Sequence, residues 1–162
     1  MSLKETVPTK NWKALYNAPF AAAVYVALAS GGTSDFPKEL FSAGKFISEQ
    51  TKQSGETGYG ELVDELTIDL KNMPEDEAKA ITLDYQGKHK TAIRSQAKQA
   101  VADAAAVVAE LAGADGYRRW LLDAARRAAE TKSGGFLGIG AKAEVDEKEQ
   151  AALDELKSIL GM

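Results

Sequence analysis

The residue types in this chain that could do chemistry are mainly carboxylates, because its 162 residues contain no cysteine and one histidine. Glu61, Glu65 and Asp69 recur every four residues and so share one face of a helix, with Asp64 beside them. Hard cations prefer oxygen ligands, but acids at this spacing are more typical of a solvated helix face. No Glu-x-x-His pair accompanies them, which argues against a di-iron bundle site.

The glycine-rich segment GGFLGIG, residues 134–140, raises the question of a phosphate-binding loop. Such loops follow a strand and open a helix, whereas the residues before this segment have helical apolar spacing. Four acids between residues 144 and 149 would also repel a phosphate at the start of the next helix. We therefore expect the glycines to form a turn and Phe136, Leu137 and Ile139 to fill the end of the core.

Histidine and basic residues give two further patterns. His89 is flanked by Lys88 and Lys90, which oppose a bound cation, so we expect a solvated or helix-capping histidine. Lys90, Arg94 and Lys98 recur every four residues as a basic stripe, which we expect to meet either the acidic 61–69 face or an acidic partner. The overall net charge is −4, which argues against a nucleic-acid interface.

The elements that must position these residues are helices. Apolar spacing is helical nearly everywhere, and no convincing alternation with a period of two is present. A hydrophobic content of 44% and a charged content of 27% are ordinary for a soluble globular protein. The sequence therefore predicts an all-α, single-domain bundle of six or seven helices over residues 1–162, with residues 1–10 disordered or partly a cloning scar.

The run FAAAVYVALA, residues 20–29, predicts a helix that is apolar on all sides and therefore buried at the centre. We expect this helix to begin near Ala18, with Asn17 as its cap and Pro19 in its first turn. Its ten apolar residues fall far short of the ~20 that a membrane span needs, so we expect no membrane insertion. A cytoplasmic location is expected, and the lack of cysteine is compatible with it.

The remaining helices are expected from their caps and breaks. Ser34 or Asp35 caps the second helix, and Asp115 caps a later one. A long pattern from residue 75 to residue 111 predicts either a kinked helix or two helices joined near Gly87. Its narrow apolar seam consists largely of small residues: Ile93, Ala97, Val101, Ala104, Val108 and Leu111. The last helix starts at Asp146, which stands three residues before Glu149 in capping-box order. Helices are expected over residues 61–70 and, for this last one, over the segment VDEKEQAALDELKSIL, residues 145–160.

Two stretches resemble known families. The segment WLLDAARRAAETKSGGFLGIGAKAEVDEKEQAALDELKSILG, residues 120–161, is similar to the C-terminal end of a family of small uncharacterised bacterial proteins with a GGFLGfGG-like loop. The segments ALASGGTSDFPKEL, residues 27–40, and AEVDEKEQAALDELKSILG, residues 143–161, look like the TerB-like tellurite-resistance fold, an all-helical bundle. Gly31-Gly32 stands where that family has Asp-Gly.

The TerB-like resemblance implies a divalent metal ion contacted by Asp35, Glu39, Asp146 and Glu149. Helix capping explains Asp35 and Asp146 without any ligand, so both interpretations stay open. We expect a non-catalytic cytoplasmic helical protein with a stress-response or scaffold role and, if TerB-like, divalent-cation binding. The alternative is a small-ligand-binding protein or enzyme with a pocket between helices near residues 134–140. Apart from a divalent metal ion no cofactor is expected, and a protein partner or a homo-oligomer is compatible with the sequence.

Overall fold

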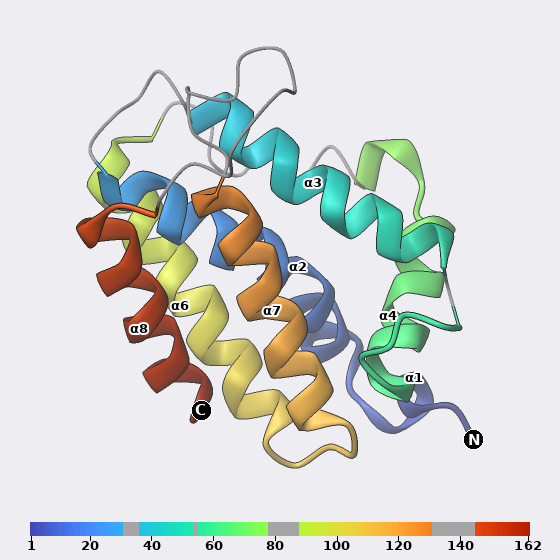
Figure 1. Ribbon diagram of the computed structural model, residues 1–162. Helices are drawn as coiled ribbons and strands as arrows, with labels where there is room; N and C mark the ends of the chain where they lie inside the picture. The colour runs from blue at the N-terminus through green and yellow to red at the C-terminus, as the bar shows by residue number, and fades with distance from the viewer. Residues whose placement is uncertain (31–35, 54, 78–87, 131–144) are drawn as a thin grey trace.

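The computed structural model describes residues 1–30, 36–53, 55–77, 88–130 and 145–162 (Figure 1). All regular elements in these ranges are helical, which confirms the predicted all-α class, and the eight elements with defined bounds are close to the six or seven expected. Their bounds are α1 Leu3–Thr6, α2 Thr9–Ala27, η1 (a 3₁₀ helix) Leu28–Ser30, α3 Phe36–Lys52, α4 Glu61–Lys71, α6 Lys90–Val108, α7 Ala114–Ala129 and α8 Glu147–Leu160.

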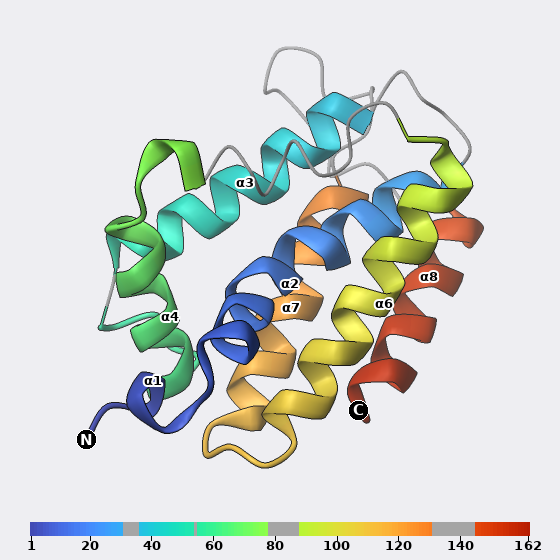
Figure 2. The ribbon, with the colours of Figure 1, turned by 180° about the vertical axis from the view of Figure 1, so that it is seen from behind.

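Helix α2 occupies the centre of the bundle. It packs most extensively against α6 and α7 and also contacts α3, α4 and α8 (Figures 1 and 2). All residues from Ala21 to Leu28 are buried, which confirms the predicted central helix. Within the described ranges, no helix combines the length and the apolar character needed to cross a bilayer.

The predicted start of this central helix is wrong by nine residues. Helix α2 begins at Thr9, after Pro8 in an extended conformation, so Asn17 and Pro19 both lie inside the helix and Asn17 is not its cap. The turns before Pro19 are held by buried Trp12 and Leu15, which extend the apolar face toward the N-terminus. Residues 1–10, expected to be disordered or partly a cloning scar, include α1 and the first residues of α2.

A proline inside a helix leaves one carbonyl without its usual donor, because proline has no N–H. For Pro19 that carbonyl belongs to Leu15, four residues earlier. The Tyr117 hydroxyl on α7 donates to the Leu15 carbonyl oxygen at 2.7 Å, and both residues are 0% exposed. A side chain from a neighbouring helix therefore supplies the missing hydrogen bond, and α2 continues through the proline.

Helix α6 carries the predicted seam of small apolar residues. Ile93, Ala97, Val101, Ala104 and Val108 are all buried, as expected. Leu111, the last residue of the predicted seam, lies beyond the end of α6 and is half-buried. The long 75–111 pattern does not form one continuous helix, because residues 75–77 are helical and residue 89 is extended. The predicted break residue, at position 87, lies outside the described residues.

Helix α7 begins at Ala114 with Gly113 as its cap residue, so the prediction of Asp115 as the cap is wrong. Gly113 has φ +85°, and the Asp115 carboxylate instead accepts from Arg118 at 3.0 Å. At Gly116, a Cβ atom would lie 1.6 Å from the carbonyl oxygen of Tyr59. The start of α7 therefore touches the backbone just before α4 through a position where only glycine fits.

Candidate functional site

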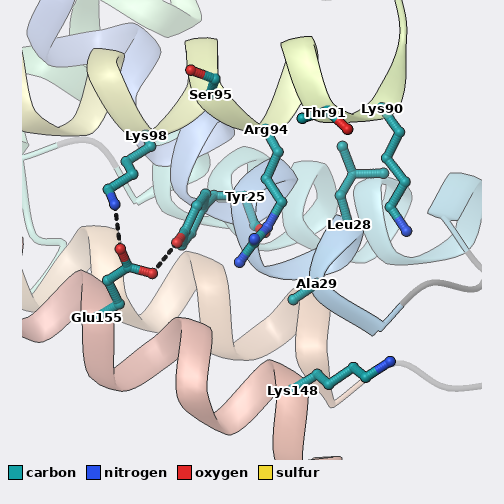
Figure 3. Close-up of a pocket in the computed structure, with 10 residues that line it drawn as sticks. All are labelled: Tyr25, Leu28, Ala29, Lys90, Thr91, Arg94, Ser95, Lys98, Lys148 and Glu155. Atoms are coloured by element: carbon teal, nitrogen blue, oxygen red, sulfur yellow. Dashed lines mark hydrogen bonds and ion pairs between the residues drawn. The ribbon is translucent and has the colours of Figure 1, made fainter.

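A basic pocket lies between α6, α8 and the C-terminal end of α2 (Figure 3). Its volume is about 570 Å³, and among the described residues its lining contains four cationic side chains, Lys90, Arg94, Lys98 and Lys148, and one carboxylate, that of Glu155. Helices α6 and α8 begin, and α2 ends, at the same end of the molecule (Figure 2). The predicted basic stripe therefore lines this pocket, and the expectation that it meets the acidic 61–69 face is wrong.

The spacing of the stripe follows from helix geometry. Residues four apart on α6 lie on one face, and the small buried residues of the same helix occupy a neighbouring face. Ala97 and Ala104 are buried in the core, while the basic side chains at the edge of α6 line the pocket together with residues at the end of α2. From Lys90 to Lys98 the stripe extends about 12 Å along the axis, at 1.5 Å per residue.

One end of the pocket is lined by three residues from three helices, Tyr25, Lys98 and Glu155. The Glu155 carboxylate of α8 accepts hydrogen bonds from the Tyr25 hydroxyl of α2 and from the Lys98 ammonium of α6. The Lys98 contact is also an ion pair, with side-chain exposures of 47% for Lys98 and 41% for Glu155. The carboxylate is thus fixed by two partners while still touching solvent.

These contacts shift the pKa values of two groups. The hydrogen bonds from Lys98 and Tyr25 lower the pKa of Glu155 below its usual value, so the carboxylate stays ionised at neutral pH. Burial and, second, the hydrogen bond to Glu155 raise the pKa of Tyr25 to about 12. Glu155 is therefore a poor proton acceptor and Tyr25 a poor proton donor near pH 7.

Arg94 lies in the middle of the stripe and is held against α2. Its guanidinium carbon is 4.3 Å from the centre of the Tyr25 ring, a cation–π contact. Its Nε donates to the Tyr25 carbonyl oxygen at 3.3 Å, near the negative C-terminal end of α2. Arg94 thus stabilises the helix end, and in the described part of the chain no carboxylate forms an ion pair with its guanidinium.

Lys90 and Lys148 lie at the other end of the pocket, at the first turns of α6 and α8 (Figure 3). Among the described residues, no carboxylate forms an ion pair with either ammonium group. His89 precedes Lys90 as the cap of α6, and its Nδ1 accepts from the Thr91 N–H at 3.3 Å. This confirms the predicted capping histidine.

The arrangement can bind an anion. Four cations face one carboxylate, and one of these cations is already neutralised by that carboxylate. The acids Glu147 and Glu149 share the first turn of α8 with Lys148, but their side chains do not line the pocket. They reduce the long-range attraction for anions, so the pocket acts through direct contact rather than through a far-reaching positive field.

Of the residues expected to contact a metal ion, Asp146 and Glu149 form the predicted capping box. The Asp146 carboxylate accepts from the Glu149 N–H at 2.8 Å, and the Glu149 carboxylate accepts from the Asp146 N–H at 3.2 Å. Asp35 and the side chain of Glu39 lie outside the described residues. In the part of the chain that is described, no three His, Asp or Glu side chains are grouped to hold a metal. The four-residue metal site stays a prediction.

The glycine-rich segment also lies outside the described residues, which end at 130 and resume at 145. The expected burial of Phe136, Leu137 and Ile139 therefore stays a prediction.

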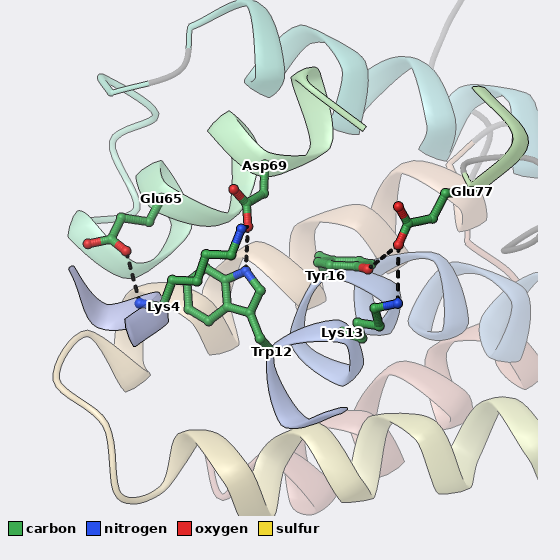
Figure 4. A network of polar contacts seen from close by, with 7 residues as sticks. All are labelled: Lys4, Trp12, Lys13, Tyr16, Glu65, Asp69 and Glu77. Atoms are coloured by element: carbon green, nitrogen blue, oxygen red, sulfur yellow. Dashed lines mark hydrogen bonds and ion pairs between the residues drawn. The ribbon is translucent and has the colours of Figure 1, made fainter. Parts of the chain in front are cut away.

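The acidic face of α4 has a structural use that the sequence did not reveal (Figure 4). The Glu65 carboxylate accepts from the backbone N–H groups of Leu3 and Lys4 at 3.0 and 3.2 Å. Asp69 accepts from the Trp12 indole N–H at 2.6 Å and pairs with Lys4 at 2.8 Å. These acids hold the N-terminal segment and are not simply solvated.

Glu77 adds a second set of contacts beside this face. It accepts from the Tyr16 hydroxyl at 3.2 Å and pairs with Lys13 at 3.3 Å. Burial and the neighbouring Glu77 charge raise the pKa of Tyr16 to about 12. We call the seven residues of Figure 4 the N-terminal contact cluster: Lys4, Trp12, Lys13, Tyr16, Glu65, Asp69 and Glu77.

Sequence reasoning missed Tyr25 and Glu155 as pocket residues. Tyr25 carries the only side-chain polar group in the apolar run 20–29, and a buried tyrosine hydroxyl needs a partner, so a signal was present. Glu155 had no such signal, because it is one of several acids on an amphipathic helix. Comparisons of the chain with protein-family models, with curated proteins and with solved structures each found no match.

Proposed function

We propose that this protein binds a small anionic ligand in the basic pocket and is not an enzyme. The observation that carries the proposal is the charge of the pocket lining, in which, over the part of the chain that the structure describes, four cations from α6 and α8 meet one carboxylate. The volume of about 570 Å³ is within the range of small-molecule sites. Thr91 and Ser95 add hydroxyl groups that can donate to the same ligand.

Binding is favoured over catalysis by the proton-transfer groups of the pocket. General acid–base catalysis is most effective when the pKa of the group is near the working pH. The lowered pKa of Glu155 and the pKa of about 12 for Tyr25 place both groups away from that range. Hydrogen bonds hold Lys98, Glu155 and Tyr25 together, so these side chains are suited to contacting a bound ligand rather than to proton transfer.

The test is calorimetric titration with inorganic phosphate at constant ionic strength, together with the thermal unfolding midpoint. We expect saturable binding by the wild type, and a dissociation constant raised about tenfold when Lys90→Gln and Lys148→Gln are combined, equivalent to about 1.4 kcal/mol. The matched control combines Lys10→Gln and Lys71→Gln, two exposed lysines outside the pocket, with the same change in net charge. Equal weakening in both double variants would mean that only net charge matters, and would refute the pocket.

A cytoplasmic location is a further part of the proposal and is supported by the absence of cysteine. A bacterial stress-response or scaffold role is another part, supported by the family resemblances. Divalent-cation binding through Asp35, Glu39, Asp146 and Glu149 is the competing function. It is tested by titrating Ca²⁺ or Zn²⁺ while following the unfolding midpoint. A rise that disappears in Asp35→Ala combined with Asp146→Ala supports it, and no rise with either ion argues against it.

A further inference from the structure

We propose that the basic pocket selects ligands that carry one anionic group and, at the other end of a short chain, a hydrogen-bond donor such as an ammonium or hydroxyl group. Glu155 is the residue that sets this selectivity. The inference rests on the proposed anion binding and names the ligand class of the same site. It follows from the different chemistry of the two ends of the pocket (Figure 3).

The two ends are far enough apart to contact different parts of one ligand. Lys148 and Glu155 are seven residues apart on α8, or about 10 Å along the helix axis. An extended six-carbon chain spans about 7 Å between its terminal groups, since three backbone bonds cover roughly 3.5 Å. A hydrogen-bond contact adds about 3 Å. A six-carbon ligand can therefore place its anion near Lys90 and Lys148 and its other end near Glu155.

The Glu155 carboxylate retains acceptor capacity. An ionised carboxylate has about four lone-pair sites. Tyr25 binds one of its oxygens and Lys98 binds the other, which leaves positions for a donor from a ligand. The side chain is 41% exposed, so a ligand can reach it without rearrangement of the core.

The same carboxylate disfavours a second anionic group. Such a group would face Glu155 at close range or would have to displace it from Lys98, and like charges brought together without compensation are repelled. Anions are therefore attracted more strongly at the Lys90 end than at the Glu155 end, where Glu155 already neutralises Lys98 and Arg94 is the remaining cation. Two-ended ligands are sorted by the charge of their second group.

The experiment compares three ligands of equal chain length by calorimetric titration: hexanoate, adipate, and aminohexanoate with its amine on the terminal carbon. In the wild type we expect aminohexanoate to bind most tightly and adipate most weakly, with about tenfold between them, equivalent to about 1.4 kcal/mol. The Glu155→Gln variant should reverse the order, because the glutamine is uncharged and Lys98 becomes available to the second carboxylate. The control is Asp154→Asn, which removes the same charge at an exposed neighbour outside the pocket.

The outcomes separate the inference from the proposed function. If adipate binds the wild type as tightly as aminohexanoate, or if Glu155→Gln changes all three affinities by the same factor, the selectivity is refuted while the anion pocket stands. If Asp154→Asn reverses the order as well, general charge accounts for the effect and the role of Glu155 is refuted. If phosphate and all three carboxylates fail to bind the folded wild type, both proposals fall.

Discussion

The N-terminal contact cluster and the basic pocket both bring charged side chains of several helices together, but they differ in how those charges are balanced. In the cluster, Asp69 and Glu77 each pair with a lysine, and Glu65 accepts two backbone N–H groups. In the pocket, one carboxylate faces four cations. Groups that satisfy one another within the chain stabilise the fold, whereas surplus charge of one sign is available to a ligand.

The comparison predicts that changes near the cluster reduce stability and that changes in the pocket reduce binding. The largest expected effect is at Gly116, which contacts the carbonyl of Tyr59 just before α4. Gly116→Ala would place a Cβ atom 1.6 Å from that oxygen, so the backbone must shift. We expect a loss of about 3 kcal/mol in the free energy of unfolding, measured by urea denaturation.

The control for this prediction is Gly44→Ala, because Gly44 also lies within a helix but has no atom within 4 Å of an added Cβ. That change should be neutral or stabilise by up to about 1 kcal/mol. If the two alanine variants are equally stable, the close approach of α7 to Tyr59 is not a real constraint.

The second expected effect concerns Tyr117, a buried polar group used only inside the fold. Tyr117→Phe leaves the Leu15 carbonyl without a donor, since Pro19 cannot supply one. An unsatisfied buried acceptor costs about 1–3 kcal/mol, and we expect a loss of about 2 kcal/mol by chemical denaturation. In a Pro19→Ala background the helix can supply its own N–H, so the same change should cost clearly less. A double-mutant cycle with no coupling would contradict this explanation.

The smallest expected effect tests the comparison directly. Combining Lys4→Gln with Lys13→Gln removes two ion pairs of the cluster. Both lysine side chains are 55% exposed, so these ion pairs contribute little to the free energy of unfolding. We expect a loss of about 1 kcal/mol in stability with phosphate affinity unchanged. Combining Lys90→Gln with Lys148→Gln should do the opposite, with stability within about 0.5 kcal/mol of the wild type. Loss of phosphate binding in the cluster variant would contradict the division of roles.

Much of the fold could be predicted because helix patterns are local. The apolar run 20–29, the seam of α6 and the capping box at Asp146 each depend on residues within a few turns, and all three are present as expected. The start of α2 at Thr9 is not evident from the sequence, because a proline such as Pro19 is typical of the first turn of a helix. Its acceptance inside the helix depends on Tyr117, 102 positions away from Leu15 in sequence.

The candidate site was only partly predictable. The spacing of Lys90, Arg94 and Lys98 predicts the basic stripe on α6. It does not predict which residues face the stripe, because these come from α2 and α8. The acids of α4 had the spacing of a solvated face, yet Glu65 and Asp69 bind the N-terminal segment. The spacing of residues along a helix shows which side chains share a face of that helix. It does not show which other helix covers the face.

The all-helical class, the central buried helix and the two opposite charge patterns follow from the order of the residues alone, since they depend on propensity and on the 3.6-residue repeat. Which of the two charge patterns is neutralised depends on how the helices pack. Packing of α1 and α2 against α4 places donors on the acidic face, and packing of α8 beside α6 brings Glu155 to Lys98 while Lys90 and Lys148 remain at the other end of the pocket. Charge balance depends on distances between separate helices, which a local pattern does not specify.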